Sequence, residues 1–192
     1  MVKHLLRWVL LTLLGRPSVR IRTDRITVFF ANHSSNMDNA VIWTALEDAT
    51  RARTRFVAGE DYWGHGFVRT RIAKAFNALL INRREVTREN NPLEKMLDCL
   101  KNGDNLVLYP EGTRSTTDEI GDFRAGIYHL AKKTSDVDFV PIKIVNASRM
   151  MPKGSFVPLP IICRVSVGEP IQFTNQSKAD FLMELKKSLE AM

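Results

Sequence analysis

Residues 26–38 read ITVFFANHSSNMD, a short apolar run that passes directly into a polar segment. β-branched and aromatic side chains dominate the run 26–31, which predicts a strand covered on both faces. Apolar residues then recur at helical spacing between positions 37 and 46, so we expect a helix to follow. His33 is therefore expected at the end of a buried strand, just before a helix.

The same alternation continues along the chain. Further strands are predicted at 54–58, 78–82, 106–110, 139–145, 163–167 and 171–173. Helices are predicted after residue 67, between the flanking signals Asn91 and Gly103, over 123–133 and over 177–192. Strands that alternate with helices indicate a single α/β domain, in which a mixed, mostly parallel sheet is covered by helices.

Composition limits the classes of protein. A chain of 192 residues suits one domain. Its 28 basic and 21 acidic residues give a net charge of +7, which favours nucleic acid, an anionic membrane surface, or a phosphorylated or acidic-carrier substrate. P-loop, GxGxxG, GxSxG and HExxH motifs are absent, and the two cysteines lie far apart. A metal site and a disulfide scaffold are therefore not expected.

Residues 1–25 combine a short apolar stretch with six basic residues and one acidic residue. The stretch LLRWVLLTLL is about half the ~20 residues that a bilayer span needs. With Trp8 and flanking arginines it is typical of a helix lying in the membrane interface. We therefore divide the chain into an interfacial helix with a basic segment at 1–25 and a catalytic domain at 26–192. An ordinary helix packed on the core is the alternative.

His33 and Asp38 are candidates for acid–base chemistry. If the chain folds back after the strand, the Asp38 carboxylate can fix the imidazole tautomer and stabilise the imidazolium. The second ring nitrogen is then free to take a proton from a substrate hydroxyl. The pair alone also fits a histidine at a helix start and an aspartate that favours the positive helix end.

Two other predicted strand ends carry polar residues. The strand 106–110 leads into Glu111-Gly112-Thr113-Arg114-Ser115, which offers backbone N–H groups, hydroxyls and a guanidinium for a phosphate. The strand 78–82 ends at Arg83 and Arg84, either of which can point toward the same anion. A polar surface turn and a solvated arginine pair remain the alternatives for these residues.

Together these segments resemble the glycerolipid acyltransferase family, typified by the lysophosphatidic-acid (1-acylglycerol-3-phosphate) acyltransferases. The family's NH-x(4)-D motif matches residues 32–38, and its [FY]PEGTRS motif matches residues 109–115. Its second motif, which ends in an arginine after a short apolar strand, matches at Leu80, Ile81 and Arg83. Its V-P-[IV] motif matches residues 140–142. The motifs occur in the family's order, and the resemblance covers about residues 26–173.

The resemblance implies a glycerol-3-phosphate acyltransferase-like fold and oxygen acyl transfer from acyl-CoA or acyl carrier protein to a lysophospholipid. It implies that His33 is the general base and that Asp38 orients it. It also implies that the phosphorylated acceptor, most simply 1-acylglycerol 3-phosphate, contacts Arg83, Glu111, Gly112, Thr113 and Arg114. Asn77 and Asn82 depart from the second motif, where glycine and an acidic residue are usual.

By the same resemblance no metal or bound cofactor is required, and the acyl donor acts as a co-substrate. The expected partners are an anionic membrane surface, the lysophospholipid and the acyl donor. We expect a peripheral protein on the cytoplasmic face of a membrane. Nucleic acid is not expected, because the aromatic residues lie mostly in apolar runs. Another lysolipid or glycerol 3-phosphate as acceptor, a thioesterase, and a non-enzymatic membrane-binding module are the alternatives.

Overall fold

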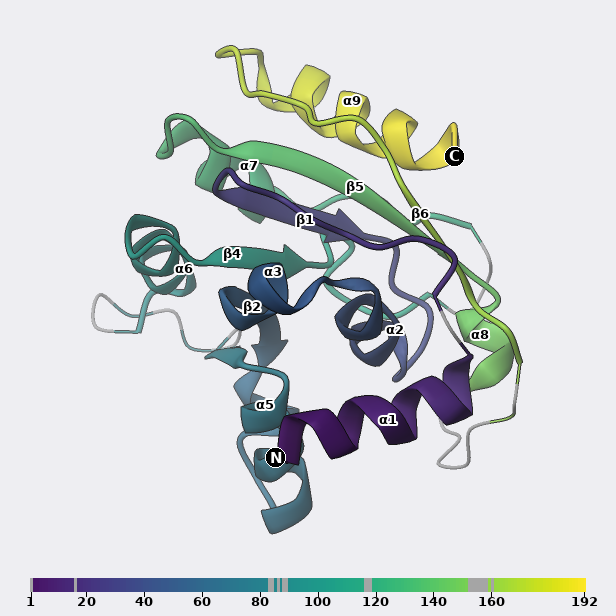
Figure 1. Cartoon of the computed structure of the whole chain (residues 1–192). Coiled ribbons are helices and arrows are strands. Elements are labelled where there is room, and N and C mark those ends of the chain that lie inside the picture. Colours follow the sequence, from purple (N-terminus) through teal and green to yellow (C-terminus); the bar gives the residue numbers. More distant parts are fainter. Residues whose placement is uncertain are drawn as a thin grey trace.

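The computed structural model of the chain describes residues 2–15, 17–82, 85, 87, 90–115, 119–151, 159 and 161–192. Within these residues a six-stranded sheet has the order β3–β2–β4–β1–β5–β6 (Figure 1). The strands are β1 (Thr27–Ala31), β2 (Thr54–Gly59), β3 (Ala78–Ile81), β4 (Asn105–Leu108), β5 (Asp138–Val145) and β6 (Arg164–Val167). The helices are α1 (Val2–Leu14), α2 (Asp38–Ala45), α3 (Asp48–Ala52), α4 (Glu60–Trp63), α5 (Phe67–Ala75), α6 (Pro92–Lys101), α7 (Gly126–Lys132), α8 (Ala147–Met150) and α9 (Lys178–Glu190).

Strand directions confirm the predicted mixed, mostly parallel sheet. β1 is parallel to both of its neighbours, β4 and β5, and β2 is parallel to β3 and β4. Only β6 among these strands is antiparallel, and it lies at one edge beside β5. The carboxyl ends of β1 and β4 therefore meet at one edge of the sheet, where ligand sites of α/β folds form.

The predicted strand at 171–173 is wrong. Ile171 and Phe139 exchange two backbone hydrogen bonds of 2.8 Å, but the pairing is an isolated bridge. Gln172 and Phe173 add no further ladder pair to this bridge, and the segment runs on as a loop toward α9.

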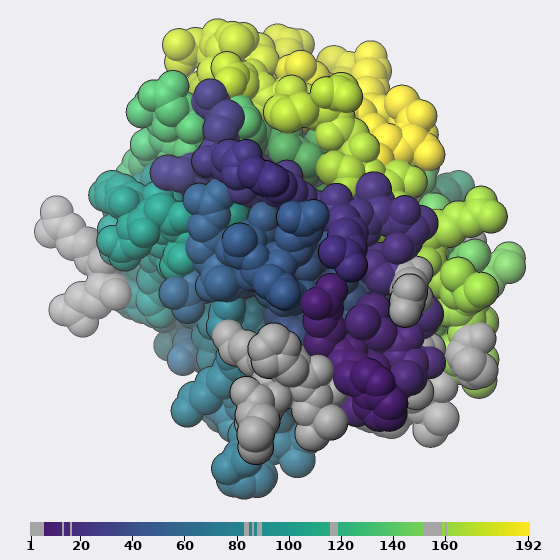
Figure 2. Space-filling view, in the orientation of Figure 1, coloured from purple at the N-terminus to yellow at the C-terminus, as the bar shows by residue number. Residues whose placement is uncertain are grey.

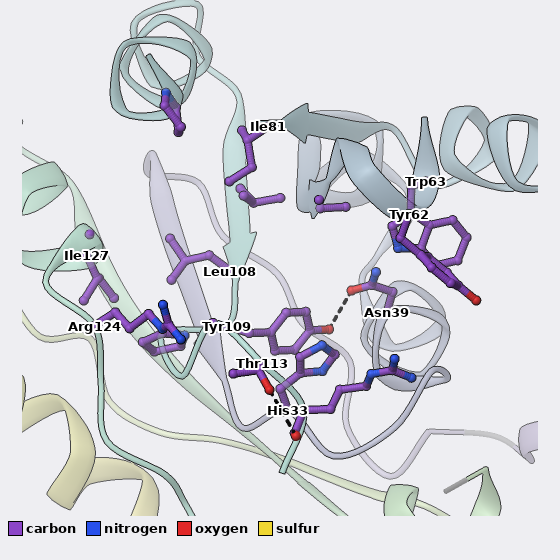
Figure 3. A pocket seen from close by; sticks show the side chains of 18 of the residues that line it. His33, Asn39, Tyr62, Trp63, Ile81, Leu108, Tyr109, Thr113, Arg124 and Ile127 are labelled. Atoms are coloured by element: carbon purple, nitrogen blue, oxygen red, sulfur yellow. Dashed lines mark hydrogen bonds between the residues drawn. The ribbon is translucent and has the colours of Figure 1, made fainter. Parts of the chain in front are cut away.

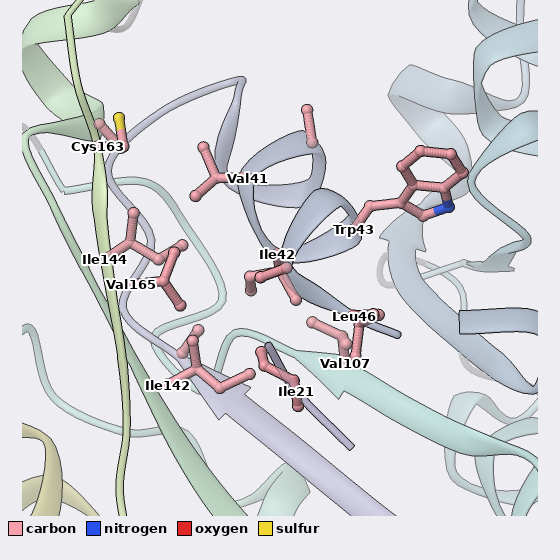
Figure 4. Close-up of a cluster of buried hydrophobic side chains, with 14 of the residues drawn as sticks. Ile21, Val41, Ile42, Trp43, Leu46, Val107, Ile142, Ile144, Cys163 and Val165 are labelled. Atoms are coloured by element: carbon pink, nitrogen blue, oxygen red, sulfur yellow. The ribbon is translucent and has the colours of Figure 1, made fainter. Parts of the chain in front are cut away.

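Both faces of the sheet carry a hydrophobic core, and β1 supplies each of them in turn. Phe29 and Ala31 join the cluster under α1 and α2, whereas Val28 and Phe30 join the cluster under α6, α7 and α9. Figure 4 shows the first cluster, in which side chains of α2 meet those of β4, β5 and β6. This two-sided burial explains why β1 reads as a nearly continuous apolar run.

The amino-terminal helix α1 packs on the domain. Leu10 and Leu14 are buried in the cluster under α1 and α2, while Trp8 is 65% exposed. Arg7 pairs with Asp48 at 3.2 Å. In Figure 2 α1 (purple) lies against the blue surface formed by the α2–α3 region. α1 thus has an inner face in the core and an outer face in solvent.

No helix among the described residues has both the length and the hydropathy that a membrane span requires.

Candidate active site

The site forms where β1 and β4 end side by side. Asn32 fixes the end of β1, because its side chain donates to the Ile144 carbonyl at 2.9 Å and accepts from the Ile144 N–H at 2.8 Å. The segment after β4 closes on it, since the Ser115 N–H donates to the His33 carbonyl at 2.7 Å. Residues 32–38 and 109–115 therefore form one continuous structure, as their positions at strand ends predict.

His33 and Asp38 meet as the sequence predicts. The His33 Nδ1 atom lies 2.7 Å from Asp38 Oδ2. The same oxygen accepts the backbone N–H groups of Ser34 and Ser35, each at 2.9 Å. Because an ionised carboxylate oxygen can only accept hydrogen bonds, this contact favours the tautomer in which Nδ1 carries the proton and Nε2 presents its lone pair. Asp38 is 1% exposed, which keeps water from competing for this contact.

Glu111 is hydrogen-bonded to the His33 backbone, and it lines a second cavity at His33 and not the one that holds Arg114. Its Oε1 accepts the His33 backbone N–H at 2.8 Å, and its Oε2 accepts the Gly121 N–H at 2.9 Å. The residue is only 7% exposed. Both carboxylate oxygens therefore accept backbone N–H groups, an arrangement that positions His33. The predicted contact of Glu111 with a phosphorylated acceptor stays a prediction.

Tyr109 holds the imidazole ring on its face. The rings of His33 and Tyr109 are stacked, with centroids 4.1 Å apart and an interplanar angle of 17° (Figure 3). The Tyr109 hydroxyl donates to Asn39 Oδ1 at 2.6 Å. Burial raises the pKa of Tyr109 well above its usual value, with a smaller contribution from Asp38. The phenol therefore stays protonated and keeps donating to Asn39 across the usual range of pH.

A cavity of about 530 Å³ opens over this histidine. One part is polar and is lined by His33, Ser35, Asn36, Asn39, Thr113, Arg114 and Arg124. The other part is apolar and is lined by side chains of β2, β3, β4, α6 and α7, namely Val57, Ala58, Ile81, Leu108, Met96 and Ile127 (Figure 3). A molecule with a charged head and a hydrocarbon chain fits such a division.

Two guanidinium groups face the polar part of the cavity. Arg114 is hydrogen-bonded to Asn36, and Arg124 donates through Nε to the Glu111 carbonyl at 3.2 Å. Among the described residues, no carboxylate lies within ion-pair distance of either group. Gly112 has a φ of +74° and passes so close to Arg124 that a Cβ atom there would lie 2.6 Å from its Nε. The absence of a side chain at this position therefore lets the Arg124 side chain pack against the backbone of residue 112.

Thr113 also lines this cavity, and its hydroxyl donates to the Arg114 carbonyl at 3.3 Å. Arg83 lies outside the described residues, so its predicted contact with the acceptor stays a prediction. A second cavity, of about 680 Å³, also reaches His33 and is lined by residues that include Lys143 and Lys186. Both cavities therefore border His33.

Three contributors were not among the predicted site residues. Asn36 and Asn39 line the cavity, where Asn36 is hydrogen-bonded to Arg114 and Asn39 to Tyr109. Arg124 reaches it from the turn before α7, and its place in the segment Phe123-Arg124-Ala125-Gly126 is the signal that points to it. No group of three or more His, Cys, Asp or Glu side chains within the described ranges is arranged to hold a metal ion.

An α/β domain with this His–carboxylate pair at the carboxyl ends of its parallel strands matches known proteins. The family model described as Acyltransferase matches residues 18–145. The chain therefore belongs to the acyltransferase family, which confirms the family that its motifs predict.

The relatives agree with this assignment. LPAT1 from Arabidopsis thaliana, named a chloroplastic 1-acyl-sn-glycerol-3-phosphate acyltransferase, is 33% identical over 136 residues, which are 69% of this chain and 35% of LPAT1. A probable 1-acyl-sn-glycerol-3-phosphate acyltransferase from Mycoplasma pneumoniae is 28% identical over 121 residues, 61% of this chain and 43% of the relative. The chain thus spans less than half the length of these curated relatives.

The fold has a solved counterpart. The crystal structure of the 1-acyl-sn-glycerophosphate (LPA) acyltransferase PlsC from Thermotoga maritima superposes with a TM-score of 0.73 and 23% sequence identity. The match covers 99% of this chain and 77% of that chain. This similarity confirms the predicted α/β fold.

Proposed function

We propose that this chain transfers a fatty acyl group from an acyl-CoA or acyl-carrier-protein thioester to the free hydroxyl of a lysophospholipid. The acceptor that we favour is 1-acylglycerol 3-phosphate, with phosphatidic acid as the product in phospholipid biosynthesis. The observation that carries the proposal is the 2.7 Å contact between His33 Nδ1 and Asp38 Oδ2 beside a cavity that is lined by two arginines and by apolar side chains.

The reaction needs one base and no protein nucleophile. As the acceptor oxygen bonds to the thioester carbonyl carbon, its proton moves to His33 Nε2, and Asp38 stabilises the imidazolium that forms. Collapse of the tetrahedral intermediate breaks the C–S bond, and the imidazolium returns its proton to the leaving thiolate. In this scheme Glu111 holds the His33 backbone N–H and Tyr109 stacks on the face of the imidazole ring, so both fix the position of the base.

The substrates are placed by charge and polarity. Arg114 and Arg124 would bind the phosphate of the acceptor through charge-assisted hydrogen bonds. The apolar part of the same cavity would hold an acyl chain. The outer face of α1, with Trp8 exposed, supports a peripheral association with an anionic membrane.

The test is a panel of acceptors incubated with labelled acyl-CoA and acyl carrier protein, with the products identified by mass spectrometry. We expect acylated 1-acylglycerol 3-phosphate, and little product from His33→Ala. His129→Ala is the matched control, because His129 lies on α7 outside both cavities. Release of free fatty acid without an acylated lipid would indicate a thioesterase instead. Full activity of His33→Ala would refute the mechanism.

A further inference from the structure

The α4–α5 segment, residues 60–75, carries a cluster of large apolar side chains in solvent. Phe67 is 73% exposed, Val68 66% and Ile72 38%, and Tyr62 on α4 is 36% exposed. Of α5, only Ala73 is buried. The segment projects at the lower edge of the molecule in Figures 1 and 2 and forms a protruding tip there.

Basic groups accompany this apolar tip. Arg69, Arg71 and Lys74 are all exposed, and α5 has no acidic residue, although Glu60 and Asp61 begin α4. The Arg71 guanidinium lies 4.6 Å from the centroid of the Phe67 ring. The Arg69 guanidinium lies 4.4 Å from the Tyr62 ring centroid. A stacked guanidinium keeps its in-plane N–H donors available for phosphate oxygens.

The tip adjoins the cavity over His33. Tyr62 and Trp63 of α4 line that cavity, and α5 begins four residues later. Aromatic and aliphatic side chains flanked by arginine and lysine are typical of segments that insert into the headgroup region of an anionic bilayer.

We propose that the α4–α5 tip is a membrane-docking surface that inserts Phe67 and Val68 into an anionic bilayer beside the cavity mouth. A lipid that leaves the bilayer there reaches the cavity without crossing water. This inference rests on the proposed function only for the identity of that lipid; the docking itself does not depend on catalysis.

The test is cosedimentation of the full chain with vesicles of phosphatidylcholine containing about 30 mol% phosphatidylglycerol. We expect Phe67→Ser/Val68→Ser to lower the partition coefficient by about tenfold or more, because two apolar side chains lose their burial in lipid. Arg69→Gln and Arg71→Gln should each lower it by about fivefold, and less at high salt. Ile162→Ser/Met183→Ser is the matched control, since both of its residues are exposed apolar side chains elsewhere on the molecule.

Two outcomes would overturn the proposal. One is equal vesicle binding by wild type, Phe67→Ser/Val68→Ser and the control variant. The other is a Phe67→Ser/Val68→Ser variant that binds vesicles like wild type but selectively loses activity with acyl carrier protein as the acyl donor. That result would make the tip a protein-docking surface. Activity on a detergent-solubilised acceptor separates the docking proposal from the proposed function. Docking is supported if Phe67→Ser/Val68→Ser retains that activity. A wild-type protein that is inactive on every acceptor refutes the proposed function alone.

Discussion

Replacing Glu111 by glutamine tests whether this buried carboxylate positions the imidazole or binds a substrate. The side chain is almost isosteric, so the packing of this 7% exposed residue is preserved. Glutamine offers one oxygen and one NH2 group where the carboxylate offers two oxygens. Either the His33 N–H or the Gly121 N–H must therefore face another donor.

The cost follows from these two bonds. Leaving one buried N–H without an acceptor costs about 1–3 kcal/mol, and a neutral acceptor weakens the remaining bond by about 1 kcal/mol. Relief from burying a charge offsets part of this loss. We expect Glu111→Gln to lower the free energy of unfolding by about 2 kcal/mol, and Glu111→Ala, which orphans both N–H groups, to lower it by more.

Two assays check the prediction. Urea unfolding gives the stability change, with the exposed Glu119→Gln in the same loop as the control, expected within about 0.5 kcal/mol of wild type. Steady-state kinetics should show kcat reduced on the order of 10- to 100-fold with little change in KM for the acceptor, because a displaced imidazole slows chemistry more than binding.

Either of two results would refute this reasoning. Unaltered stability of Glu111→Gln would show that the two backbone contacts contribute nothing. A raised KM for the acceptor with an unchanged kcat would show that Glu111 binds the substrate, as the motif resemblance implies.

Substitutions at Asp38 and Tyr109 and one labelling experiment on Cys163 give three further predictions. Asp38→Asn should lower kcat on the order of 10³- to 10⁴-fold, because an amide no longer enforces the His33 tautomer, and a loss below tenfold in steady-state assays would contradict this. Tyr109→Phe keeps the stack on His33 and loses the bond to Asn39, so urea unfolding should show a loss of about 1 kcal/mol in the free energy of unfolding. Tyr109→Leu removes the stack as well, so its kcat should fall clearly more than that of Tyr109→Phe. Burial raises the pKa of the Cys163 thiol to about 11, so a thiol reagent should label it slowly at pH 8, at a rate rising about tenfold per pH unit up to that pKa; rapid labelling of the folded protein would contradict this.

The local part of the site followed from the sequence. His33 and Asp38 are five residues apart, and a strand end followed by a helix start is enough to bring the imidazole and the carboxylate together. The motif at 109–115 was likewise placed at a strand end by the apolar run before it. The predicted strands and helices also appear, except that pairing at 171–173 reduces to one bridge.

Only the tertiary structure decided which distant residues act together. Glu111 lies 78 residues after His33, and Tyr109 lies 70 residues after Asn39, yet each pair is in hydrogen-bond contact. These contacts exist because β4 lies beside β1, an order that the hydrophobic pattern of the strands leaves open.

The sequence by itself thus determined the α/β class, the His–Asp pair and the polar, arginine-bearing segment after β4, since each depends on neighbours in the chain. The structure decided that Glu111 supports the histidine, that Tyr109 stacks on it and that Arg124 enters the cavity. The physical reason is that hydrogen-bond partners and ring stacks depend on which strand ends are adjacent, and sheet order sets that adjacency through long-range packing.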